Sequence, residues 1–228
     1  LAGVIGSRTR VALVAGMAVL MALLWLSGAA FAVWPLWLAA AGWLLNLYWV
    51  TRYPESSQQW QATSRRLLMG VWVLLPCWVG FNVLRDSGAV WLLFVMLLVW
   101  TADIGAYFAG RRWGKRKLAP RVSPGKSWEG VYGGLAATML LALLFALWQP
   151  LGVMGGVALI VITAVVTLTS VLGDLFESML KRYRNIKDSS QLLPGHGGVL
   201  DRIDSLTAAI PIFALLYLQV LSLQVSAL

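Results

Sequence analysis

Residues 153–180, VMGGVALIVITAVVTLTSVLGDLFESML, form a long apolar stretch that decides the fold class of this chain. A helix needs about 20 mainly apolar residues to cross the roughly 30 Å hydrocarbon core of a bilayer, and this stretch exceeds that length. Charge interrupts it only at Asp174 and Glu177, both near its end. The stretch therefore predicts a membrane-spanning helix that carries carboxylates close to one of its ends.

The composition of the whole chain supports the same class. Of its 228 residues, 60% are hydrophobic and 12% are charged, against roughly 45–50% and 25% in an average soluble domain. A soluble globular protein is therefore excluded. Further apolar runs predict spans at 11–26, 31–50, 67–84, 89–109, 131–148 and 206–223. We expect an all-α, polytopic transmembrane helical bundle of about seven spans, with an N-terminal part at 1–87 and a second part at 88–228.

The net charge of +9 is compatible with nucleic acid, an anionic membrane surface or a phosphorylated substrate as partner. With seven spans, every Lys and Arg except Arg85 falls on one side of the membrane. Basic loops concentrate on the cytoplasmic side of membrane proteins, so we predict that this side is cytoplasmic and that no nucleic acid is bound. The polar loops 110–130 and 181–205 both lie there, brought together by the hairpin of spans between them.

Two aspartates lie inside predicted spans, where an ionised Asp costs about 2.5–3.5 kcal/mol and is a functional candidate by default. Asp103 and Asp174 each lie about two helical turns from the expected cytoplasmic end of their span. Further oxygen-bearing side chains follow at i+3 or i+4 spacing: Glu177, Ser178, Asp201 and Asp204. Clustered carboxylates suit Mg²⁺ that also contacts substrate phosphates. The alternative is that these acids pair with basic residues and cap helices.

The loops contain further candidates for phosphate binding. Residues 194–198, PGHGG, can turn backbone N–H groups toward an anion; an ordinary turn between helices is the alternative. His196 is the only histidine, so a multi-histidine metal site is excluded. Gly125-Lys126-Ser127 is no P-loop, because Pro120 replaces the required glycine. The basic residues of 110–130 either bind anionic lipid head groups or neutralise a nucleotide triphosphate.

The stretch 178–204, SMLKRYRNIKDSSQLLPGHGGVLDRID, resembles the signature of the phosphatidate cytidylyltransferases, or CDP-diacylglycerol synthases, of the bacterial type. A second block, with DIGAY at 103–107 and SPGKSWEG at 123–130, is similar to another part of that family. The resemblance covers about residues 88–220. Ile104 departs from it, since many relatives have a small polar residue there. Relatives usually carry further spans before the region of 11–26, so we expect that N-terminal spans precede this chain.

The resemblance implies that CTP reacts with phosphatidic acid to give CDP-diacylglycerol and pyrophosphate at the bacterial inner membrane, with the active site facing the cytoplasm. It also implies a homodimer and dependence on Mg²⁺, with a second cation as an option. The implied metal ligands are Asp174 and Asp201, with Asp103 as a further candidate. The catalytic set then adds Asp204, Lys187 and His196. The implied substrate-binding set is Ser178, Lys181, Arg182, Asp188, Gly197, Gly198, Arg202 and Lys126.

Two rival functions predict sequence features of their own. A CDP-alcohol phosphotransferase would need D-G-x-x-A-R followed by G-x-x-x-D-x-x-x-D, and the chain contains no such run. An ion-coupled transporter would use its intramembrane acids along a permeation path, at broken helices near the bilayer midplane. In this sequence the acids lie toward one face of the membrane, the expected cytoplasmic one, instead of near the midplane. The transporter is kept as the alternative from a different functional class.

Overall fold

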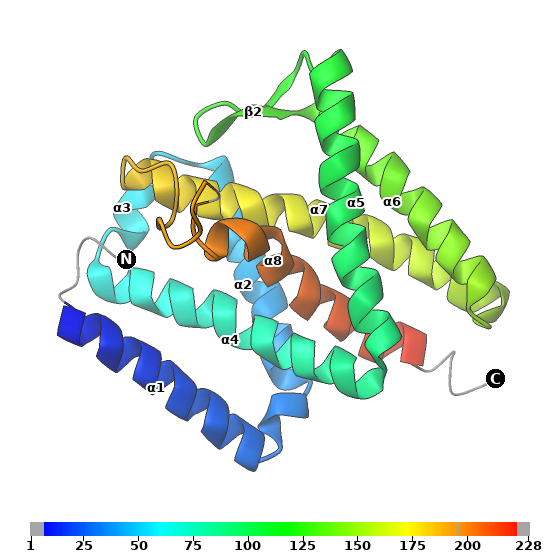
Figure 1. The fold of residues 1–228 in the computed structure, drawn as a ribbon, viewed down its shortest axis with the longest axis horizontal. Helices are drawn as coiled ribbons and strands as arrows, with labels where there is room; N and C mark the ends of the chain where they lie inside the picture. The colour runs from blue at the N-terminus through cyan, green and yellow to red at the C-terminus, as the bar shows by residue number, and fades with distance from the viewer. Residues whose placement is uncertain (1–6, 196, 223–228) are drawn as a thin grey trace.

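The computed structural model describes residues 7–195 and 197–222 (Figure 1). Helices dominate, which confirms the predicted helical membrane bundle; one short pair of antiparallel strands departs from the all-α expectation. The elements are α1 (Ser7–Leu26), η1 (Ala29–Phe31), α2 (Trp34–Thr51), α3 (Ser57–Trp60), α4 (Thr63–Ser87), α5 (Ala89–Trp113), β1 (Lys117–Ala119), β2 (Ser123–Ser127), α6 (Trp128–Trp148), α7 (Gly152–Tyr183), α8 (Leu200–Leu216) and η2 (Tyr217–Leu221).

Six helices of the described residues are long and apolar enough to cross a membrane, one fewer than the seven spans expected. They are α1, α4, α5, α6, α7 and α8 with its continuation η2. The predicted span at 31–50 becomes α2, which has 18 residues but includes Pro35 and Asn46 among its buried positions. α2 packs against α4, α7 and α8. Its tryptophans and these two residues lower its hydropathy, so α2 is not among the six candidate spans.

α8 forms the centre of the bundle, between α4 and α7 (Figure 1). It is the most buried of the six candidate spans, and Ala208, Ala209 and Phe213 are completely shielded. Small residues allow the close contact with α7, because a Cβ added to Gly173 would lie 2.7 Å from the Asp204 carbonyl oxygen. The start of α8, which carries the predicted acids, is therefore held tightly against α7.

α5 and α6 approach each other through a stripe of small residues. A Cβ added to Gly105 would lie 2.7 Å from the carbonyl oxygen of Gly133, and one added to Gly133 would collide with Ala109. In membranes, such small-residue stripes allow two helix backbones to pack closely. This contact sets the position of Asp103 on α5 relative to the first turns of α6.

A β-hairpin connects α5 to α6. Its strands are joined by a tight turn in which Val122 N donates to Ala119 O at 3.1 Å. Pro120 stands at the second position of that turn, where its fixed φ is favoured. β2 leads directly into α6, whose N-cap Ser127 accepts a hydrogen bond from Gly130 N at 3.2 Å. The hairpin thus lies over one end of the α5–α6 pair (Figure 1).

α7 is longer than a membrane requires. Its 32 residues extend over about 48 Å at 1.5 Å per residue, against a hydrocarbon core of roughly 30 Å. Lys181 and Arg182 lie in its last turn, so the C-terminal end is the polar one. The helix ends at Tyr183. Just beyond its C-cap, Asn185 has a φ of 52°, and Ile186 N donates back to Lys181 O at 3.0 Å. The polar end of α7 therefore carries the candidate site residues.

Candidate active site

A cavity of about 470 Å³ lies between α5, β2, α6 and α7. Its polar side chains include Asp103 from α5, Lys126 from β2 and Asp174 from α7. Much of the remaining wall consists of small residues of the α5–α6 stripe: Ala102, Ala106, Gly110, Gly130 and Gly134. The close α5–α6 contact thus leaves space beside the acids, and residues of the polar loop 110–130 meet Asp103 and Asp174 there.

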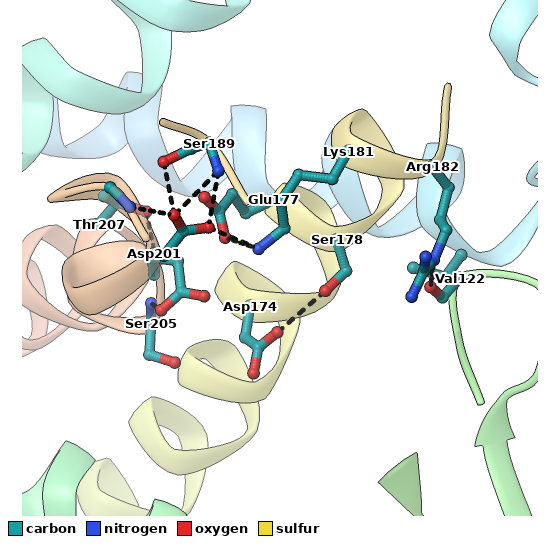
Figure 2. Close-up of polar contacts among 12 residues, drawn as sticks. Val122, Asp174, Glu177, Ser178, Lys181, Arg182, Ser189, Asp201, Ser205 and Thr207 are labelled. Atoms are coloured by element: carbon teal, nitrogen blue, oxygen red, sulfur yellow. Dashed lines mark hydrogen bonds and ion pairs between the residues drawn. The ribbon is translucent and has the colours of Figure 1, made fainter. Parts of the chain in front are cut away.

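Lys126 and Asp174 form an ion pair across this cavity, with 2.6 Å between Nζ and Oδ2. Both side chains are partly open to solvent, at 26% and 28% exposure. Ser178, one turn further along α7, donates its hydroxyl to Asp174 Oδ1 at 3.2 Å (Figure 2). The structure therefore brings together three predicted site residues, and the ion pair ties the hairpin to α7.

Two further carboxylates, Asp103 and Asp204, interact electrostatically with the Lys126–Asp174 pair. Asp103 interacts with Lys126, Asp174 and Asp204, and Asp204 interacts with Asp174. Three carboxylates therefore surround the single ammonium group of Lys126. Their excess negative charge attracts cations to the site. Asp204 is itself held at the first turns of α8, where Ser205 N donates to its Oδ1 at 2.7 Å.

The carboxylates of the cavity meet part of what Mg²⁺ requires. Among the described residues, no group of three or more His, Cys, Asp or Glu could hold a metal by itself. Mg²⁺ usually takes one or two protein carboxylates and completes its shell with water and substrate phosphates. Asp103 and Asp174, which line the same cavity, fit that incomplete shell. The full predicted set of Asp103, Asp174 and Asp201 is not assembled in the part of the chain that is described.

Asp201 belongs to a second network (Figure 2). Its side chain is only 8% exposed and does not line the cavity. Its Oδ1 accepts from Lys181 Nζ at 2.8 Å, and its Oδ2 accepts from Ser189 Oγ at 2.7 Å and from Gly198 N at 2.7 Å. Ser189 N also donates to Oδ2, at 2.9 Å. The glycine-rich loop thus directs a backbone N–H group toward the protein's own carboxylate rather than toward the cavity.

Lys181 is also engaged within the protein. Its Nζ lies 2.7 Å from Glu177 Oε2 as well as 2.8 Å from Asp201 Oδ1. Glu177 is 5% exposed, and its other oxygen, Oε1, has no hydrogen-bond partner among the described residues. The predicted role of Lys181 in substrate binding stays a prediction, because in this structure the lysine joins α7 to the start of α8.

Arg182, another predicted substrate-binding residue, anchors the hairpin. Its Nε donates to Val122 O at 3.2 Å, and Val122 is almost fully buried (Figure 2). At the base of the hairpin, Glu129 accepts from Arg116 Nε at 3.1 Å. This hydrogen bond raises the pKa of the Arg116 guanidinium above its ordinary value. Contacts at the tip and at the base therefore hold the strand that carries Lys126.

The remaining predicted residues lie on the loop after α7 or at the start of α8. Lys187, Asp188 and Arg202 are exposed, and Arg202 has interactions of its own. Gly197 has a φ of 80°, and a Cβ there would lie 2.9 Å from Asp201 Oδ2, so the position requires glycine. His196 lies outside the described residues. The structure thus does not bring the three exposed residues to the cavity.

Sequence reasoning missed Tyr107 and Ser189, and it included Arg111 only as one of the basic residues of 110–130. Tyr107 and Arg111 line the cavity, and Arg111 Nη1 donates to Tyr107 Oη at 2.9 Å. Their positions, four and eight residues after Asp103, place them on its helix face, so helical periodicity contained that signal. Ser189 gave no such signal, because its contact with Asp201 depends on the path of the loop.

These features define a class: a multi-pass helical membrane protein with an acidic, lysine-containing cavity at the polar end of its bundle. The profile of the Cytidylyltransferase family matches residues 4–220. The chain belongs to that family, and the resemblance found in the sequence is confirmed.

Individual relatives are similar over most of this chain. The phosphatidate cytidylyltransferase of Pseudomonas aeruginosa is 53% identical over 215 residues, covering 91% of this chain and 77% of the relative. That of Haemophilus influenzae is 48% identical over 195 residues, covering 80% and 68%. That of Staphylococcus epidermidis is 42% identical over 139 residues, covering 61% and 53%. The match to the Pseudomonas aeruginosa enzyme therefore includes both polar loops, 110–130 and 181–205.

Proposed function

We propose that this protein is a phosphatidate cytidylyltransferase, which makes CDP-diacylglycerol and pyrophosphate from CTP and phosphatidic acid in bacterial phospholipid synthesis. The observation that carries the proposal is the 53% identity to an enzyme of that name over 91% of the chain. The cavity with Asp103, Lys126 and Asp174 supports it, because it combines carboxylates with a cation at the polar end of membrane-spanning helices.

The reaction suits these residues. A phosphate oxygen of the lipid attacks the α-phosphorus of CTP, a new P–O bond forms, and pyrophosphate leaves with the electrons of the broken bond. The attacking oxygen is already anionic at neutral pH, so no strong general base is required. Catalysis then depends on positioning and on neutralising charge. Lys126 and Arg111 line the cavity and would contact the phosphates, and Asp174 would hold the Lys126 ammonium group in position before substrates bind.

Asp103 and Asp174 would hold Mg²⁺ in this proposal, with Asp204 nearby. When bound, the ion offsets the repulsion between two polyanionic substrates and stabilises the leaving pyrophosphate. Ser178 would orient Asp174 through their hydrogen bond. Asp201 stays a predicted ligand, and it would have to exchange hydrogen bonds with Lys181, Ser189 and Gly198 to act as one. The optional second cation would share the same carboxylates.

The proposed location is the inner membrane, with the cavity toward the cytoplasm. The basic residues of 110–130 and 181–205 support this orientation, because both regions lie at the polar end of α5 and α7. CTP would enter from that side, while the lipid phosphate stays near the head-group plane. We infer that 88–228 is the catalytic part, and that the homodimer implied by the resemblance also applies; cross-linking in membranes tests the dimer.

The direct test is an assay of the purified chain in lipid nanodiscs with labelled CTP, phosphatidic acid and Mg²⁺. We expect labelled CDP-diacylglycerol and an equal amount of pyrophosphate. EDTA should abolish the product and excess Mg²⁺ should restore it. If the folded chain forms neither product, the proposal is wrong. Ion accumulation by proteoliposomes without any nucleotide chemistry would favour the transporter instead.

A further inference from the structure

Lys126 and Asp174 have different proposed partners, a phosphate and a metal ion, but in this structure they bind each other. Lys126 Nζ lies 2.6 Å from Asp174 Oδ2, and Ser178 Oγ donates to Asp174 Oδ1 at 3.2 Å (Figure 2). Both oxygens of the carboxylate therefore already have a partner. A divalent cation at Asp174 would lie beside the Lys126 ammonium group, and charges of like sign repel each other at such short range. The metal ion and the lysine therefore compete for Asp174.

The Lys126 side chain can leave Asp174 without any movement of the hairpin backbone. Arg182 Nε holds the tip of the hairpin through Val122 O at 3.2 Å, and Ser127 is fixed as the N-cap of α6. A lysine side chain has a flexible four-carbon stem, so its ammonium group can change partners while the strand stays in place. This side chain lines the cavity and is 26% exposed, so an anion that enters the cavity can reach it.

The charges of the cavity decide which ligand draws the lysine away from Asp174. Asp103 and Asp204 also interact with Lys126, so the ammonium group offsets part of the charge of three carboxylates. A triphosphate carries more negative charge than one carboxylate, and it accepts charge-assisted hydrogen bonds from an ammonium group. Once the triphosphate holds Lys126, the negative charge of the three carboxylates is no longer offset, and this favours a divalent cation.

We propose that Lys126 keeps Asp174 from binding a metal ion until a nucleotide triphosphate enters the cavity and takes over the ammonium group. The inference rests on the proposed function, because CTP is the nucleotide. Binding of the two ligands is then coupled: CTP strengthens metal binding at Asp174, and the metal strengthens CTP binding by the same factor. The cavity therefore holds a metal ion only together with the triphosphate on which the ion acts.

The first test measures metal binding by the full chain without nucleotide, in phosphatidylcholine nanodiscs. Mn²⁺ is the probe, and electron paramagnetic resonance separates free from bound ion. Lys126→Met should bind Mn²⁺ about ten-fold more tightly than the unmodified chain, because a charge-assisted contact no longer competes. Lys126→Arg keeps a cation beside Asp174 and should bind Mn²⁺ as weakly as the unmodified chain. Arg111→Met is the matched control: Arg111 lines the same cavity but is hydrogen-bonded to Tyr107, so its removal should change the Mn²⁺ affinity less than about two-fold.

A double variant separates competition at Asp174 from a general effect of charge. If the lysine acts by occupying Asp174, Lys126→Met should no longer raise the Mn²⁺ affinity in an Asp174→Asn background, so the two changes are not additive. An equal rise in both backgrounds would overturn the proposal. Equal Mn²⁺ affinity of Lys126→Met and the unmodified chain would contradict it as well, and if product still formed at the normal rate in the unmodified chain, only this inference would fail.

Binding of labelled CTP in EDTA, measured by equilibrium dialysis, guards against loss of folding. Lys126→Met should bind CTP more weakly while it binds Mn²⁺ more tightly, because the lysine serves the nucleotide and opposes the metal. A damaged cavity would bind both ligands more weakly, and that result would count against the proposal. If the unmodified chain shows the expected Mn²⁺ pattern but binds no CTP even with Mg²⁺, the proposed function fails, whereas the competition at Asp174 stands.

Discussion

Asp174 and Asp201 lie at the polar ends of α7 and α8, and the same role was predicted for both. Asp174 is 28% exposed, faces a cavity and has a lysine and a serine as partners. Asp201 is 8% exposed, and its oxygens accept from a lysine, a serine hydroxyl and two backbone N–H groups. A carboxylate has about four acceptor positions. Asp174 therefore retains capacity for a ligand, whereas Asp201 uses its capacity to fix the glycine-rich loop.

The largest effect is expected at Asp174. Asp174→Asn keeps the shape of the side chain but removes the charge that faces the cavity, so CDP-diacylglycerol formation should fall about 10²–10³-fold, as when another charge-stabilising group is removed from an active site. Thermal stability should change little, because the side chain is partly exposed. Turnover of labelled CTP measures the effect. Glu55→Gln, an exposed carboxylate elsewhere, is the control and should keep normal activity.

The next effect is a structural one at Asp201. Asp201→Asn places an amide NH₂ among groups that donate, and it leaves Lys181 with only part of its buried pairing; breaking such a pair costs about 3–5 kcal/mol. The loop should therefore open more often, and trypsin should cut after Lys187 at least about 100-fold faster. Lost turnover with an unchanged cleavage rate would break the comparison, and Asp201 would then act directly on substrate or metal.

The two serines provide a matched pair of smaller changes. Ser189→Ala removes a hydroxyl from Asp201, and Ser178→Ala removes one from Asp174. Each hydrogen bond is worth about 1 kcal/mol, or roughly five-fold. Ser189→Ala should speed loop cleavage by that factor with little effect on turnover, and Ser178→Ala should slow turnover with no effect on cleavage. If Ser189→Ala slowed turnover and Ser178→Ala speeded loop cleavage instead, Asp174 would not be the ligand site and Asp201 would not be the residue that anchors the loop.

The smallest effect is expected at an exposed ion pair on the hairpin. Arg121 and Glu55 are 2.8 Å apart, and their side chains are 67% and 69% exposed. Exposed pairs contribute about 0–1 kcal/mol. Arg121→Gln should leave turnover within about two-fold of normal, because Val122 and Arg182 hold the hairpin. A loss comparable with that of Asp174→Asn would mean that this pair also positions Lys126.

Much of the fold was predictable because the bilayer imposes a simple rule on length and hydropathy. The spans at 67–84, 89–109, 131–148 and 153–180 all correspond to helices. α2 was harder to assign as a membrane span, because a Trp side chain combines an apolar ring with a polar N–H group. The packing of α2 against α4, α7 and α8 involves residues far apart in the sequence, so local hydropathy does not reveal it. The β-hairpin was missed because β1 has only 3 residues and lies in a charged segment without an alternating pattern.

The site was predictable in its residues but only partly in its connections. The cost of a carboxylate in a membrane singled out Asp103 and Asp174, and both line the cavity. The ion pair of Asp174 with Lys126 was not foreseen, because it depends on a hairpin that folds across α7. The hydrogen bonds of Asp201 with Lys181, Ser189 and Gly198 were not foreseen either. Spacing along a sequence does not show which acceptor a loop N–H group will contact.

The length of α7 has a consequence for the membranes in which this protein works. Asp174 lies toward the C-terminal end of a helix that is longer than the hydrocarbon core. In a thicker bilayer the head-group plane lies closer to Lys181 along α7, and in a thinner bilayer it lies farther from Lys181, unless the helix tilts to compensate. Acyl-chain length in the host membrane therefore tunes how closely a lipid phosphate matches the depth of the cavity.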